Sequence, residues 1–99
     1  MKIIVKRSGG LAGLGEQLGA IDTDTLDPAR ARQVRALVED AHFFDLPPAL
    51  PSRAVGADLF RYEITASEGG RRHKVTFVDD QSPEVAPLRS LVDALGRLG

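Results

Sequence analysis

The stretch FRYEITASEGGRRHKVTF, residues 60–77, decides the fold. Its first half alternates strictly, with Tyr62 and Ile64 on one face and polar side chains on the other, which predicts a half-buried strand. The pair Gly69 and Gly70 predicts a tight hairpin turn, because glycine adopts the positive φ that two-residue hairpin turns require. A second alternating run follows the turn. We therefore expect an antiparallel hairpin here.

A second hairpin is expected at the N-terminus. Residues 1–7 are rich in β-branched side chains, with Ile3 and Val5 on one face, and residues 17–23 alternate more weakly. Both runs predict strands. The glycine-rich segment 8–15 lies between them and is expected to be a long loop.

One helix is expected after each hairpin. The first begins at Asp27 and Pro28, because the Asp side chain accepts from free amides of the first turn and Pro is tolerated at the first helical position. Pro87 leaves two alternatives for the second: a short 3₁₀ turn before a helix that begins at Pro87, or a distorted first turn. The apolar stripes are Val34, Leu37, Val38, Ala41 and Phe44 in the first helix, and Leu88, Leu91, Val92, Leu95 and Leu98 in the second.

The predicted order is strand, strand, helix, strand, strand, helix. Each helix and the sheet can bury a single apolar face, and the simplest solution places both helices on one side of the sheet. We therefore predict an α+β fold, a two-layer sandwich with a four-stranded antiparallel sheet and two helices on one face, as a single domain over residues 1–99.

The composition sets limits on function. The 99 residues carry a net charge of −1 and include no cysteine, which excludes disulfides, thiol nucleophiles and thiolate metal sites. The apolar run at the N-terminus is too short for a signal peptide or a membrane span. We expect a cytoplasmic monomer without a cofactor, and the balanced charge gives no global attraction to nucleic acid or anionic lipid.

Several short motifs resemble chemical sites only superficially. No helix is expected after the glycine run 10–15, as a phosphate loop would need, and segment 22–27 lacks the glycine and glutamate of a calcium loop. His42 and His73 have no metal-ligand spacing. The acidic pair 79–80 lies beside a predicted helix start, which favours negative charge. We expect no catalytic residues and no metal ligands.

Basic residues could gather on the uncovered face of the sheet. An RNA-binding sheet would interleave such residues with aromatic rings. Here Phe60, Tyr62 and Phe77 are expected on the core face, which disfavours RNA. The basic residues are Lys2, Lys6, Arg61, Arg71, Arg72 and Lys74.

Two irregular loops carry apolar side chains. Such side chains either pack into a small core of their own or are offered to a partner, and the sequence leaves both alternatives open. The leucines are Leu11 and Leu14 in the loop 8–15, and Leu46 and Leu50 in the loop 44–57.

The sequence of several segments resembles that of the emfourin family, which consists of small bacterial proteins that inhibit thermolysin-like zinc metalloproteases such as protealysin. The resemblance extends over nearly the whole chain. It is most specific in the Arg-Ser-Gly-Gly-x-Ala-Gly loop and in the Phe-Phe-Asp-Leu-Pro helix exit. The segments that carry it are Lys6–Leu14, Asp22–Asp24, Phe43–Pro47, Phe60–Tyr62 and Gly69–His73.

This resemblance implies a protein inhibitor of a thermolysin-like protease and not an enzyme. Leu11 or Leu14 would fill the apolar pocket of the cleft, and a proline-rich loop would add a second contact. Neither loop contains cysteine or histidine, so we expect steric occlusion and not zinc ligation. The alternative is a non-catalytic adaptor domain that uses the same loops. The expected contact residues are Ser8, Gly9, Gly10, Leu11, Ala12, Gly13 and Leu14, with Pro47, Pro48 and Pro51.

Overall fold

The computed structural model describes residues 1–9, 15–50 and 59–98. The strands are β1 (Lys2–Gly9), β2 (Glu16–Asp22), β3 (Phe60–Glu68) and β4 (Arg71–Val78). The α-helices are α1 (Pro28–Asp40) and α2 (Ala86–Leu98), and the short 3₁₀ helices are η1 (Thr23–Thr25) and η2 (Phe43–Asp45).

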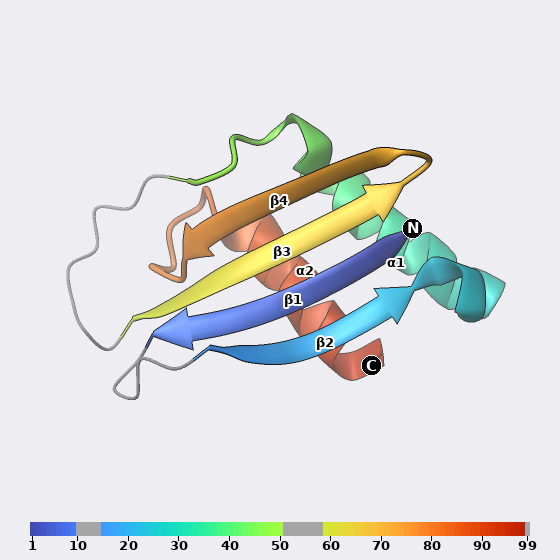
Figure 1. Ribbon diagram of the computed structural model, residues 1–99, viewed down its shortest axis with the longest axis horizontal. Helices are drawn as coiled ribbons and strands as arrows, with labels where there is room; N and C mark the ends of the chain where they lie inside the picture. Colours follow the sequence, from blue (N-terminus) through green and yellow to red (C-terminus); the bar gives the residue numbers. More distant parts are fainter. Residues whose placement is uncertain (10–14, 51–58, 99) are drawn as a thin grey trace.

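The four strands form one antiparallel sheet in the order β2-β1-β3-β4. Both α-helices cover the same face of this sheet (Figure 1). The predicted α+β sandwich and its element order are therefore confirmed. The central pair β1 and β3 joins the two hairpins, with Ile3 opposite Ala66 and Val5 opposite Ile64.

The core lies between the sheet and the helices. Inward residues of the strands, such as Ile3, Ile64 and Val75, are buried against Val34 of α1 and Leu91 of α2. Each such side chain removes from water the apolar area that stabilises the fold, at about 1.5–3 kcal/mol per residue. The remaining buried members of the cluster are Val5, Ile21, Val38, Ala41, Phe43, Tyr62, Ala66, Phe77, Val85, Leu88 and Leu95.

The local signals for the helices hold. Asp27 caps α1, with its carboxylate accepting from the Arg30 amide at 2.9 Å. Before α2, the amide of Ala86 donates to the Pro83 carbonyl at 3.3 Å, so a 3₁₀-type turn leads into a helix that starts one residue before Pro87. In the first turn Pro87 removes no helical hydrogen bond.

The predicted apolar stripes can be followed along both helices. Leu37 of α1 and Val92 of α2 are partly buried and pack against the core. Phe44 also packs there, but it lies in η2 and not in the first helix, because α1 ends at Asp40. The side chain of Leu98 lies outside the described part of the chain. Within the described ranges, no helix is long and apolar enough to cross a membrane.

Glycine and alternation also fix the second hairpin. Gly69 and Gly70 have φ of +57° and +84°, the positive values that the sequence predicted for this turn. The prediction that Phe60 belongs to the core is wrong: its side chain is 39% exposed. Phe60 is the first residue of β3 and pairs with Gly9, the last residue of β1, so it lies at the very end of the sheet.

Two further predictions are corrected by the strand pairing. Ser8 and Gly9 belong to β1 and not to the loop, because β3 extends far enough to pair with them through Arg61 and Phe60. Arg71 does not share the uncovered face with the other basic residues: its guanidinium carbon lies 4.2 Å from the centroid of the Phe44 ring.

Candidate functional site

The candidate site lies where β1 ends and β3 begins, which we call the open end of the sheet. We define it by Arg7, Gly9, Glu16, Leu18 and Phe60. It is the end of the sheet at the left of Figure 1, where residues 9, 15 and 59 border the two segments outside the described ranges.

Gly9 is required by its surroundings at this end. Its φ is +92°, and a Cβ placed there would come within 2.8 Å of the carbonyl oxygen of Leu59. Both the dihedral and the close approach exclude a side chain without local movement. The glycine thus lets β1 run directly beside the start of β3, and this fixes where the following segment leaves the sheet.

Leu18 is turned toward the helical side by a β-bulge. Val5 pairs with Gly19 and Lys6 pairs with Gln17, so Leu18 is the extra residue of β2. Its side chain is 39% exposed. Bulges typically redirect a side chain in this way.

Beside Leu18 lies a hollow of about 470 Å³ between the sheet and the C-terminal half of α2. Its apolar walls include Tyr62, Val92 and Leu95, and Gly96 leaves its helix side open, with nothing within 4 Å of an added Cβ. A hollow with such a lining suits an apolar side chain of a partner.

Arg7 links the two halves of the open end. Its guanidinium carbon lies 4.4 Å from the centroid of the Phe60 ring, and it forms an ion pair with Glu16. The hydrogen bond to Glu16 raises the pKa of Arg7 above its ordinary value, and the ion pair holds the guanidinium beside Phe60. Such a contact holds the ring in place while one face remains available.

The exposed apolar side chains of the site are the signal that sequence reasoning missed. Leu18 and Phe60 are the large hydrophobic residues that the described chain exposes most. The alternation of apolar and polar residues around Leu18 is weak, because the bulge places an extra residue in β2 at this point. The interrupted alternation is the only sequence signal for the bulge. Arg7 and Glu16 could not be matched from the sequence, because their pairing depends on the register of β1 with β2.

The predicted contact residues divide into two groups. Ser8 and Gly9 lie at the open end, whereas Gly10, Leu11, Ala12, Gly13 and Leu14 lie outside the described residues, and so does Pro51. Pro47 and Pro48 are exposed beside β4, where the Thr76 amide donates to the Pro48 carbonyl at 2.8 Å. β3 lies between β1 and β4, so the structure places Pro47 and Pro48 away from Ser8 and Gly9.

The second loop answers the question that the sequence left open for its leucines. Leu46 and Leu50 pack against the core and are partly buried. The Leu50 amide donates to the Thr76 carbonyl at 3.0 Å, which holds the segment along the edge of β4. Its apolar side chains are therefore used within the fold.

The motifs that resembled chemical sites have structural roles. Asp22 accepts from the Asp24 amide at 3.0 Å in a turn. The Asp79 carboxylate accepts from Arg89 at 2.5 Å, and this hydrogen bond raises the pKa of Arg89. The described residues contain no group of three or more histidine or acidic side chains that could hold a metal ion.

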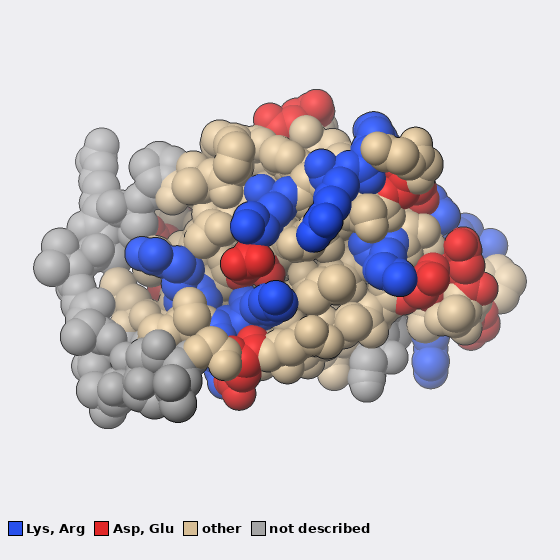
Figure 2. Space-filling view, viewed as in Figure 1, with Lys and Arg blue, Asp and Glu red and all other residues tan. Residues whose placement is uncertain are grey.

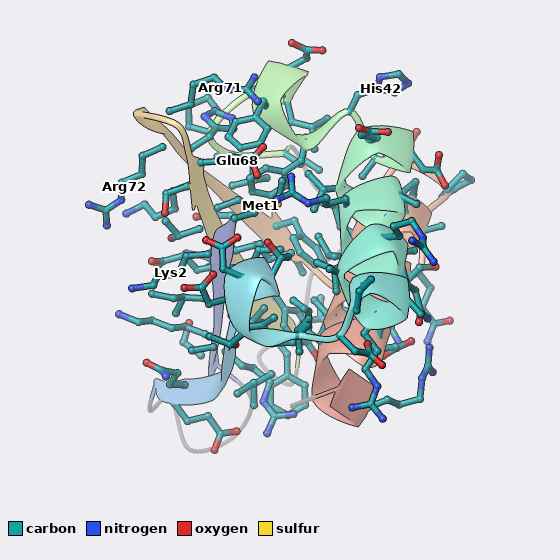
Figure 3. The ribbon with its side chains drawn as sticks, turned by 90° about the vertical axis from the view of Figure 1, so that its right-hand side faces the viewer. Met1, Lys2, His42, Glu68, Arg71 and Arg72 are labelled. Carbon is teal, nitrogen blue, oxygen red and sulfur yellow. The ribbon has the colours of Figure 1, made fainter. Side chains whose placement is uncertain are left out.

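His42 and His73 lie far from the open end. Figure 3 views the molecule from the opposite end and labels His42. His42 is exposed at the end of α1 with φ of +50°, and His73 contacts the Leu46 carbonyl through Nε2 at 2.6 Å. At this end Glu68 accepts from Arg35 at 2.5 Å, and this hydrogen bond lowers the pKa of Glu68. These charged groups are satisfied within the fold.

Comparison with known proteins identifies a family. The family model of Emfourin matches residues 5–96, nearly the whole chain. No curated protein and no solved structure matches the chain. The match spans β2, β3, β4 and α1 completely, most of β1 and α2, and every residue of the open end. The chain therefore belongs to the emfourin family.

Proposed function

We propose that this chain inhibits a thermolysin-like zinc endopeptidase by inserting the open end of its sheet into the active-site cleft. Membership of the emfourin family supports an inhibitor and not an enzyme.

The observation that carries the proposal is the position of the exposed apolar residues. Phe60, 39% exposed, pairs with Gly9 at the strand end, and Leu18, also 39% exposed, lies further along the sheet on β2, beside Val5 and Lys6. Residues 10–14 follow Gly9 directly in sequence and include Leu11 and Leu14. A cleft that accepts large apolar side chains would be offered several at this single end of the fold.

The charges at this end favour steric occlusion over zinc ligation. A carboxylate must be free to bind zinc. Glu16 is engaged by Arg7, and Asp79, whose amide donates to the Phe60 carbonyl at 3.1 Å, pairs with Arg89. Either carboxylate would have to leave its arginine before it could bind the metal.

A rigid contact would accompany the glycine-rich segment. Phe60 is held by Arg7 and by its place in β3, so little conformational entropy is lost when it binds. Pro47 and Pro48, beside β4, remain in the proposal as a second contact, together with Pro51, which follows them in sequence.

The test compares matched carboxylate substitutions. Leu18→Asp and Phe60→Asp should each raise the inhibition constant for a thermolysin-like endopeptidase by about 10- to 100-fold, the effect of removing an interface anchor. Ala29→Asp and Ala36→Asp, at exposed positions of α1, add the same charge away from both the open end and the uncovered face of the sheet, and should change the inhibition constant less than threefold, about 0.7 kcal/mol.

The result that would overturn the proposal is equal inhibition by all four variants with intact circular dichroism spectra. The double variant Leu11→Asp, Leu14→Asp examines the adjacent segment in the same assay, and unchanged potency would remove that segment from the mechanism. If the folded wild-type chain inhibits no thermolysin-like endopeptidase, the adaptor alternative is favoured.

A further inference from the structure

The uncovered face of the sheet carries a concentration of positive charge. Five exposed cations from three strands point away from the helices, and Figure 2 shows them around a central acidic residue. Lys2 and Arg72 can be seen to project on this side in Figure 3, while Arg71 lies toward the other. We call this surface the basic face; its cations are Lys2, Lys6, Arg61, Arg72 and Lys74.

The charge of the chain is divided between its two sides. Besides its five cations, the basic face carries two acidic residues of the strands, Glu63 and Asp22. Its formal charge is therefore +3. The whole chain carries −1, so all other residues together carry −4. This separation creates a local field that the net charge hides.

Most of these cations are available to a partner. Of the five cations of the basic face, only Lys74 has a carboxylate oxygen of a described residue within 4 Å, that of Glu63 at 3.9 Å. The side chain of Lys74 is still 59% exposed. A long, solvated pair of this kind holds its partners weakly, so a partner's carboxylates could replace it.

The chemistry of the basic face favours a protein over a nucleic acid. Single strands bind sheets by stacking bases on exposed aromatic rings. Here Tyr62 and Phe77 stack on each other in the core at 5.4 Å, and Phe60 contacts Arg7 on the helical side. The central Glu63 would also repel a phosphate chain.

We propose that the basic face steers the chain onto a carboxylate-rich surface beside the cleft of its protease, an inference that rests on the proposed function. Arg61 pairs with Ser8, next to the open end, and Lys6 pairs with Glu63 one step further along. When the open end enters the cleft, the basic face continues from the cleft edge over the adjoining surface. Complementary charge there accelerates association and selects among proteases.

The experiment measures association and dissociation rates by stopped flow across ionic strengths, with an endopeptidase that the wild-type chain inhibits. In the sheet variant, Lys6→Gln and Arg72→Gln remove two cations from the basic face. In the control variant, Arg30→Gln and Arg32→Gln remove two exposed cations from α1. Both variants have the same net charge.

We expect the sheet variant to associate about 3- to 10-fold more slowly at low salt, with a shallower salt dependence and a nearly unchanged dissociation rate. The control variant should match the wild type. Equal rates for both variants would overturn this inference and leave inhibition by the open end standing. If the wild-type chain inhibits no such enzyme, the proposed function fails and this inference fails with it.

A parallel measurement tests whether the basic face binds RNA instead of a carboxylate-rich protein surface. The fluorescence anisotropy of a labelled 20-nucleotide RNA is followed with wild type and sheet variant at physiological salt. Binding by the wild type that the sheet variant loses would assign the basic face to nucleic acid and overturn the inference. Absence of binding, together with the slower association above, supports a carboxylate-rich protein surface.

Discussion

Replacement of Gly9 by alanine should destabilise the protein more than any other single glycine substitution in the described chain. A φ of +92° lies beyond the left-handed region in which side chains are tolerated, and strain of this kind costs about 1–3 kcal/mol. The new Cβ would in addition meet the Leu59 carbonyl at 2.8 Å. We expect the free energy of unfolding to fall by about 2–4 kcal/mol, out of about 5–15 kcal/mol for a domain.

The control for this prediction is Gly69→Ala. Gly69 has φ of +57° and nothing within 4 Å of an added Cβ, so only the left-handed backbone penalty of about 1–2 kcal/mol applies. The difference between the two variants therefore reports the contact of Gly9 with Leu59 together with the extra strain of its larger φ.

Urea unfolding followed by circular dichroism gives both free energies. A loss of about 2–4 kcal/mol in Gly9→Ala corresponds to a midpoint temperature lower by about 10–25 °C. Equal losses in the two variants, or a loss below about 0.5 kcal/mol in Gly9→Ala, would refute the close packing of β1 on the start of β3. Inhibition measured on the folded variant then reports on the direction in which the following segment leaves the sheet.

Three further changes test the fold. Gly96→Ala should raise the free energy of unfolding by about 0.5–1 kcal/mol in thermal melts, because the site is helical and has space for a methyl group. Phe43→Ala should lower it by about 3–5 kcal/mol in urea, because this fully buried ring leaves a cavity. Arg35 lowers the folded-state pKa of Glu68 below its ordinary value of 4.5. Ionised Glu68 therefore stabilises the folded state above that ordinary value, and this stabilisation is lost as pH falls through the folded-state pKa. The midpoint temperature of thermal unfolding should therefore be higher for the wild type than for Glu68→Gln at pH 7, and the difference should disappear toward pH 3. A difference that does not change with pH would contradict the ion pair.

The fold could be predicted where local signals were strong. The alternation around Ile64, the glycine pair of the second hairpin and the cap at Asp27 each act within a few residues, and the structure confirms all three. The strand order could not be predicted in this way. It depends on the pairing of β1 with β3, which brings Lys2 opposite Ser67, and no local pattern encodes so distant a contact.

The candidate site was predicted in part for the same reason. Ser8 and Gly9 were recognised from composition and resemblance, but their place in β1 follows from the length of β3. The alternation placed Phe60 on the correct face, yet it could not show that the helices end before covering it. Leu18 was hidden by a bulge, which shifts the alternation by one residue.

Hydrogen exchange of the inhibitor in complex with a thermolysin-like endopeptidase tests the central claim most directly. If the open end enters the cleft, amide exchange slows on binding at residues 7–9, 16–18 and 59–61 and does not change at the hairpin turn 68–71. Slower exchange at the turn, with the open end unchanged, would contradict this claim.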